Sequence, residues 1–321
     1  MDLLPAKTNR VNFVKFWRCV FCFSIVVVTA RAHAVGENII DAVMRSDFVF
    51  DRNVSNVPFF PVGYLGGNVQ GGIELEDCGP ESCELSLQNY SHALGLPVWV
   101  GQKNMILLGE TLDYETIELN VPGGENQKRT IKTAGGMLAW VGQPSTSIQV
   151  GAFYYYYSGF DFGKSIDHPW GSIGGGGFRY RHRPTFHTYW GLVGINEQSM
   201  QTYIPYIGFD LYLGKKWSVS ALLPWPAISY APNKHSIYRL GAIYSSSQWV
   251  ADGDTELDVK SISQVNVGLS YERQLFSMLW GEVGAGYSGF GRYSIEEQGN
   301  VEFEQNIAST PFIKMSLNIR P

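Results

Sequence analysis

Charged residues make up only 17% of the sequence, and cysteine is scarce. Of the four cysteines, Cys19 and Cys22 lie in an N-terminal apolar run, which leaves Cys78 and Cys83. A cysteine-based metal site would need a second pair of ligands nearby, and none is present, so we predict no metal site and no cofactor. In an oxidising compartment, Cys78 and Cys83 instead predict a disulfide that closes a short loop containing Gly and Pro.

Long hydrophobic runs are absent beyond the N-terminus. The apolar run at 19–29 is shorter than the roughly 20 residues that a membrane-spanning helix needs. Basic residues precede this run, and the small-x-small sequence Ala32-His-Ala34 follows it. This pattern predicts a cleaved secretory signal over 1–34. After export, the chain can enter a membrane only as strands, because no later stretch is long and apolar enough for a helix.

Positive charge is also in short supply. Without residues 1–34, the chain keeps 19 Lys and Arg against 28 Asp and Glu, a net charge of −9. A nucleic-acid partner would require a basic surface, so none is predicted.

The stretch 310–321 shows the clearest pattern in the chain. Ile313, Met315, Leu317 and Ile319 alternate with polar residues, as in a strand with one apolar and one polar face. Such a strand needs a partner for its open edge, and pairing with the first strand would close the sheet into a barrel. The segments 203–213, 264–273 and 280–287 alternate in the same way.

Aromatic residues favour a membrane barrel over a soluble β-sandwich, which would show the same alternation. Many of them lie near predicted strand ends, as an aromatic girdle at the membrane interface would require. They are Trp99, Tyr203, Trp217, Trp225, Trp249, Tyr271, Trp280, Tyr287 and Tyr293. We therefore predict an all-β, antiparallel transmembrane β-barrel of about 12 strands, with 10 to 14 compatible, over residues 84–321.

The preceding segment, 35–83, includes the cysteine loop and has weak patterning. It is compatible with a tail, a plug or an extra strand. Within the barrel, short turns are predicted at 142–145, 183–185 and 214–216. Longer loops are predicted at 123–128, 160–173, 250–257 and 294–308, which gives the asymmetry typical of outer-membrane barrels.

Two short motifs carry a family resemblance. Ile204-Pro-Tyr-Ile-Gly-Phe-Asp210 and Leu222-Leu-Pro-Trp-Pro226 are similar to a family of Gram-negative outer-membrane β-barrels catalogued as a domain of unknown function. The resemblance covers about three quarters of the chain, from residue 84 onward. It implies a location in the bacterial outer membrane. Outer-membrane lipids, and the barrel-assembly machinery during biogenesis, would be its partners. It implies no activity and no catalytic residue.

Three arginines form the densest charged feature. Arg179, Arg181 and Arg183 share one face of a predicted strand, and a positive ladder inside a barrel would favour anions. Alternatively, the arginines lie at the rim or pair with acidic residues on other strands. The candidate lumen charges are Arg179, Arg181, Arg183, Asp210, Glu272, Glu282 and Lys314.

These observations leave two classes of function open. The first is a porin-like, narrow channel for small solutes, including small anions, or a structural barrel. The alternative is a lipase- or deacylase-like enzyme that modifies outer-membrane lipids, which would need a serine close to a histidine. Ser91-His92 and His235-Ser236 are adjacent in sequence, but neighbours on a strand point to opposite faces. The sequence therefore assigns no catalytic residue.

Overall fold

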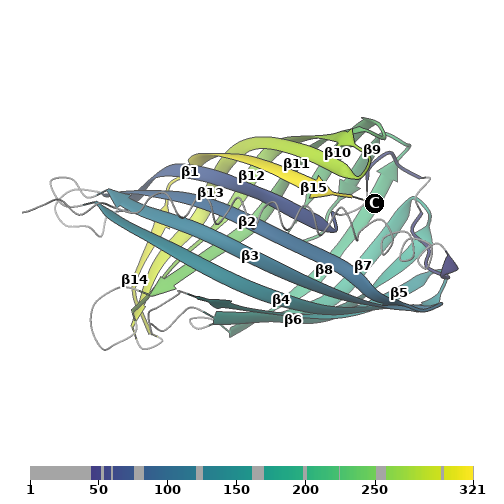
Figure 1. Cartoon of the computed structure of the whole chain (residues 1–321), viewed down its shortest axis with the longest axis horizontal. Helices are drawn as coiled ribbons and strands as arrows, with labels where there is room; N and C mark the ends of the chain where they lie inside the picture. The colour runs from purple at the N-terminus through teal and green to yellow at the C-terminus, as the bar shows by residue number, and fades with distance from the viewer. Residues whose placement is uncertain are drawn as a thin grey trace, which may run out of the picture.

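The computed structural model describes residues 45–51, 54–58, 61–75, 83–120, 126–160, 170–197, 201–223, 225–250, 258–297 and 300–320. Its strands form a single sheet that closes on itself (Figure 1). They are β1 (Gly63–Leu75), β2 (Cys83–Val100), β3 (Asn104–Asn120), β4 (Gln127–Ser145), β5 (Ile148–Gly159), β6 (Trp170–Arg183), β7 (Phe186–Glu197), β8 (Gln201–Leu213), β9 (Trp217–Ser220), β10 (Ala227–Asn233), β11 (Ser236–Val250), β12 (Asp258–Phe276), β13 (Leu279–Glu297), β14 (Asn300–Ile307) and β15 (Thr310–Ile319).

The barrel closes at β15. Each strand from β1 to β13 is antiparallel to the next, and β15 pairs with both β13 and β1. β14 pairs with the remaining part of β13 and runs on into β15, so the two occupy one position in a ring of 14 strands. The predicted antiparallel barrel and its closure by 310–319 are confirmed, with the strand number at the upper end of the predicted range.

Strands β10 and β14 lie where the sequence did not place them, and β1 corresponds to the extra strand that was one of the alternatives for 35–83. The wall begins with β1 at Gly63, before the boundary predicted at residue 84. β10 follows Pro226 and contains Pro232, and the register of its ladder with β11 shifts before Asn233. Proline normally argues against a central strand, which hid β10 in the sequence. β14 occupies part of the loop predicted at 294–308.

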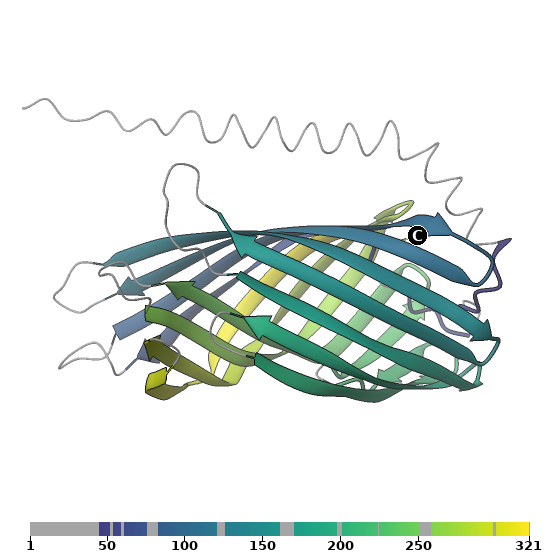
Figure 2. The ribbon, with the colours of Figure 1, turned by 90° about the horizontal axis from the view of Figure 1, so that it is seen from below.

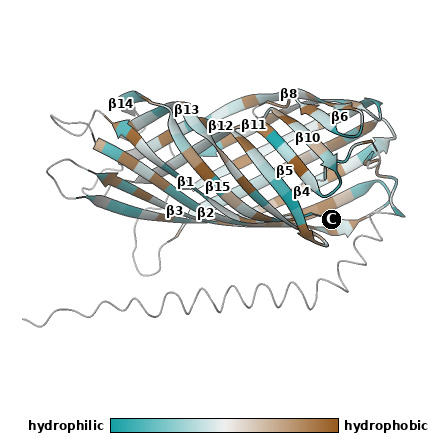
Figure 3. Cartoon of the chain, turned by 90° about the horizontal axis from the view of Figure 1, so that it is seen from above, coloured by the Kyte–Doolittle hydropathy of each residue, from teal (hydrophilic) through white to brown (hydrophobic). Residues whose placement is uncertain are grey.

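The outer face is apolar, as the alternation predicted. In β15, Ile313, Met315 and Leu317 are 60%, 63% and 40% exposed, whereas Asn318 on the opposite face is 1% exposed. Hydrophobic residues recur along neighbouring strands (Figure 3), and many of the large ones are exposed. A surface of this kind is stable against lipid and costly in water.

Most of the predicted girdle aromatics that the structure describes also lie on the outside. Trp99, Tyr203 and Tyr287 are among the exposed side chains. Trp280 and Tyr293 are corrections, because both are buried on the inner face. Their neighbours Val283 and Tyr287 carry the outward positions of β13, and the two-residue period then places Trp280 inside.

The end of the barrel that carries the longer connections has an apolar interior. Ile73, Leu85 and Ile117 belong to a buried cluster that β12, β13 and β14 complete with Ile262, Tyr293 and Ile307. Glu84, on the other face of β2, is exposed. Apolar-inside and polar-outside is the arrangement of a water-soluble sheet, so this part of the wall extends past the apolar band.

Two earlier predictions fall outside the described residues: the secretory signal at 1–34, and Cys78 of the predicted disulfide. Cys83 is buried at the start of β2. No helix in the described part of the chain is long and apolar enough to cross a membrane.

Candidate functional site

The N-terminal segment 45–62 lines the inside of the barrel at the end with the short turns (Figure 2). Its described parts are 45–51, 54–58 and 61–62, and we call this segment the collar. Backbone and side-chain bonds join it to the β2–β3 turn, then to β4, β5, β6 and β7, then to the β8–β9 turn and β10, and lastly to β15. The contacts thus follow the order of the strands around the ring.

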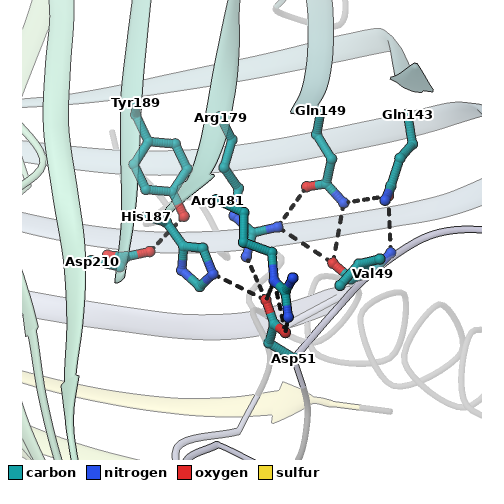
Figure 4. A network of polar contacts seen from close by, with 9 residues as sticks. All are labelled: Val49, Asp51, Gln143, Gln149, Arg179, Arg181, His187, Tyr189 and Asp210. Carbon is teal, nitrogen blue, oxygen red and sulfur yellow. Dashed lines mark hydrogen bonds and ion pairs between the residues drawn. The ribbon is translucent and has the colours of Figure 1, made fainter. Parts of the chain in front are cut away.

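Asp51 is the main attachment point of the collar (Figure 4). The Nη2 and Nε atoms of Arg181 donate to its two carboxylate oxygens at 2.8 and 2.9 Å. Arg179 Nη2 lies 3.4 Å from Oδ2, and His187 Nε2 lies 3.0 Å from the same oxygen. A carboxylate only accepts hydrogen bonds, so this contact assigns the proton of the imidazole to Nε2.

A second contact joins the collar to β4 and β5 through Val49. The backbone N–H of Val49 donates to Gln143 Oε1 at 2.9 Å. Gln149 Nε2 donates to both Val49 O and Gln143 Oε1. Arg179 Nη1 donates to Gln149 Oε1 at 2.9 Å, which links this contact to the Asp51 site (Figure 4). The collar is therefore held by a continuous polar network over four strands.

The carboxylate of Asp51 can hold the collar to the wall through its negative charge. Its side chain is 7% exposed, and burial alone would raise the pKa of the carboxyl. The hydrogen bonds from Arg181 and His187 outweigh burial, so the pKa of Asp51 lies below its usual value. Asp51 also has a positive φ of 49°, which aspartate and asparagine tolerate better than most residues.

The other predicted lumen charges form separate ion pairs. Glu272 is fully buried between Arg320, whose Nη2 lies 2.5 Å from Oε2, and Arg239, whose Nη1 lies 3.6 Å from Oε1. Lys314 Nζ lies 2.5 Å from Glu282 Oε1. These pairs connect β11, β12, β13 and β15 on the inner face.

The three arginines predicted to form one ladder do not share one environment. Phe178 and Tyr180 are exposed on the outer face, while Arg179 and Arg181 point inward to Asp51. Arg183 is exposed at the end of β6 and lies outside this network. Asp210, considered as an arginine partner, instead accepts a hydrogen bond from Tyr189 Oη at 2.6 Å.

The sequence analysis missed Asp51, although it centres the site. It belongs to a segment with weak patterning, and its partners lie about 130 residues away in the chain. The available signal was indirect: two inward arginines and a histidine on adjacent strands need a carboxylate, and Asp210, which lies opposite His187 on β8, accepts a hydrogen bond from Tyr189 instead.

The serine–histidine pairs do not form a nucleophile site. Ser91 donates to Asn89 on the inner face of β2, and His92 follows on the outer face opposite Leu112. His235 lies in the β10–β11 turn and contacts Gln274 of β12. Within the described residues, no group of three His, Cys, Asp or Glu could hold a metal ion.

The barrel has distant likenesses among solved structures, although no family model and no curated protein matches the chain. The β domain of the Bordetella autotransporter BrkA is 10% identical, with a TM-score of 0.41 over 81% of this chain and 100% of that one. A mutant of the monoaromatic hydrocarbon channel TodX is 9% identical, with a TM-score of 0.38 over 83% and 91% of the two chains.

The translocator domain of NalP from Neisseria meningitidis is 10% identical, with a TM-score of 0.30 over 92% and 98%. These neighbours are β-barrels, but scores this low carry no argument about function. The description of the barrel therefore rests on its own strand pairing. The resemblance to the uncharacterised barrel family stays a hypothesis.

Proposed function

We propose that the chain spans the outer membrane of a Gram-negative bacterium as a narrow channel for small solutes, with its short-turn mouth gated by the collar. The apolar outer face and the exposed aromatics support insertion into lipid. The short turns would face the periplasm, as is usual for such barrels.

The observation that carries this proposal is the attachment of the collar through Asp51. One carboxylate offsets the charge of two arginines from β6 and accepts a hydrogen bond from His187 of β7, and other contacts to the wall involve backbone groups and neutral amides. A segment held mainly by one charge cluster has a discrete released state, which is what a gate requires.

The first prediction is that Asp51→Asn opens the channel. Asparagine keeps the shape and tolerates the positive φ, but it removes the charge that holds two guanidinium groups. Loss of charge-assisted hydrogen bonds of this kind costs about 2 kcal/mol, on the order of 30-fold in the balance between attached and released collar. Single-channel recording in planar bilayers would show this as a corresponding rise in open probability.

Asp47→Asn is the matched control. Asp47 is exposed, and it contacts the wall through its backbone N–H, which donates to Gln102 O at 2.8 Å. We expect wild-type gating from this variant. If Asp51→Asn folds, inserts and gates like the wild type, the collar is a structural lining and the gating proposal is wrong.

The second prediction concerns pH. Because the pKa of Asp51 is lowered in the folded protein, its stabilising contacts with the arginines are fully present above the ordinary aspartate pKa of about 4. These contacts are lost as the pH falls through the lowered pKa. Open probability should therefore stay constant from about pH 7 to 5, rise only below about pH 4, and show no such rise in Asp51→Asn. A rise between pH 7 and 5 would assign the release to a histidine instead.

A further inference from the structure

The hydrogen-bonded wall is incomplete between β8 and β11. β8 pairs with β9 only through Asp210–Leu213, and β11 pairs with β10 only through Ser236–Gly241. Bonds from the β9–β10 connection to Phe209 O, Ile207 O and the N–H of Ala242 extend these ladders slightly. Beyond them, the edges at 201–206 of β8 and 243–250 of β11 have no strand partner in the described residues on the sides that face each other.

Proline explains why the wall stops there. Ala242 N–H donates to Pro226 O at 2.9 Å, but Pro226 has no N–H to return the bond, so the β10–β11 ladder ends. Phe209 O and Ile207 O accept bonds on the open side of β8, so the two-residue period directs the backbone of Pro205 to the same side. Pro205 therefore lacks a donor that another strand would need. We call the stretch of wall without strand pairing, between these two edges and the β9–β10 connection, the window.

The border of the window is uncharged and carries several apolar side chains. The segments 201–206, 221–226 and 243–247 contain no Asp, Glu, Lys or Arg. On the outer face, Tyr203, Ile207 and Tyr244 are exposed. In the β9–β10 connection, Leu223 and Trp225 are 60% and 45% exposed.

The window connects this outer surface with lumen-facing side chains. Tyr206 points inward, and its ring centroid lies 6.4 Å from that of Trp225 and 6.5 Å from that of Tyr189. Ile243 lies opposite the inward-facing Asn266 and is nevertheless 51% exposed. An exposed isoleucine on the inner face indicates unfilled space next to the window rather than a packed lumen.

The position of the window in the membrane decides which ligand it suits. Tyr203 belongs to the exposed aromatics nearer the long connections, and Ile207 lies within the apolar band, so the window faces the half of the bilayer next to the long connections. Unpaired backbone groups cannot face hydrocarbon without a cost of several kcal/mol each. The edges must therefore be solvated from the lumen, which makes the window a boundary between water and acyl chains.

From this geometry we propose that the window is a lateral port through which the alkyl chain of an amphiphile passes between the outer leaflet and the barrel lumen. The apolar rim accommodates the chain, and the unpaired peptide groups of the two edges, with the hydroxyls of Ser245 and Tyr206, receive the polar head. The port rests on the membrane-spanning part of the proposed function but is independent of the collar.

Photo-crosslinking in vesicles tests the port. One probe is a phospholipid with a diazirine on its acyl chain, and the other is a single-chain fatty acid with the same group. We expect labelling of the outward Leu240 and Tyr203, and also of the lumen-facing Tyr206 and Ile243. Lumen labelling by both probes identifies bilayer lipid as a source, whereas lumen labelling by the fatty acid alone restricts the ligand to single-chain amphiphiles.

Two matched variants sharpen the test. Ile243→Arg places a charge at the window and should reduce labelling of Tyr206 at least fivefold. Ile195→Arg places the same charge on the inner face of β7, which is paired on both edges, and should leave that labelling unchanged.

Labelling confined to outward residues, or equal labelling of Tyr206 in both variants, would overturn the port. Crosslinks between two chains at the window edges, without lumen labelling, would show that the edges bind a second copy instead. Absence of label even at Leu240 would contradict membrane insertion itself.

Discussion

Replacing Arg320 with glutamine should destabilise the barrel by about 3–5 kcal/mol, the usual cost of removing one partner from a buried ion pair. The side chains of Arg320 and Glu272 are 3% and 1% exposed, with Nη2 and Oε2 2.5 Å apart. Without Arg320, the carboxylate of Glu272 keeps Arg239 at 3.6 Å as its nearest cation. A fully buried carboxylate would then depend on one more distant cation, which stabilises it less.

Denaturant unfolding from lipid vesicles, followed by tryptophan fluorescence, measures this loss. Arg292→Gln is the matched control, because Arg292 also pairs with a glutamate, Glu304 at 3.0 Å, but both side chains are well exposed. Exposed pairs contribute about 0–1 kcal/mol. The double variant Glu272→Gln with Arg320→Gln should recover most of the stability, since it removes the buried carboxylate and leaves only Arg239, whose side chain is 32% exposed, without this partner. Equal losses for Arg320→Gln and Arg292→Gln would show that Glu272 is solvated.

The second large effect is on ion selectivity. In the wild type, Asp51 offsets the charges of Arg179 and Arg181. In Asp51→Asn, both guanidinium groups face the lumen without a counter-charge, so the channel should favour anions although the chain without residues 1–34 has a net charge of −9. Each fixed charge within about 8 Å of the ion path changes the local ion concentration about two- to threefold, even at the dielectric constant of water.

Reversal potentials under a salt gradient give the anion preference. Adding Arg179→Gln and Arg181→Gln to Asp51→Asn should abolish it. Adding Arg183→Gln should have little effect, because Arg183 lies outside the Asp51 network. Anion preference that survives the loss of Arg179 and Arg181 would place the selectivity of the channel elsewhere.

Where alternation was strict, the sequence predicted the wall correctly. In β8, β12, β13 and β15, lipid on one side and the lumen on the other impose the two-residue period on the side chains. β1 lacks this signal because glycines occupy positions that other residues cannot. A Cβ at Gly66 would lie 2.6 Å from Ser316 Cβ on β15. Close approach of strands thus removed the side chains that would have revealed β1.

The candidate site was only half predictable. The alternation of side chains along the strand placed Arg179 and Arg181 inside the barrel, because Phe178 and Tyr180 occupy the outer face. Their partner could not be found in the same way, since residues 48–51 of the collar have no regular secondary structure and therefore no period. Local patterns predict the direction of a side chain, whereas a contact between a loop and the far wall depends on closure of the whole ring.

The collar also sets a limit on the circumference of the barrel. Its 18 residues can extend over at most about 60 Å, and they make successive contacts from the β2–β3 turn round to β15. A hairpin added between β7 and β8 would lengthen this inner path without lengthening the collar. The contacts at Asp51 and at Asn56 could then no longer form together. The length of the collar, a segment outside the wall, therefore limits the number of strands that the wall can contain.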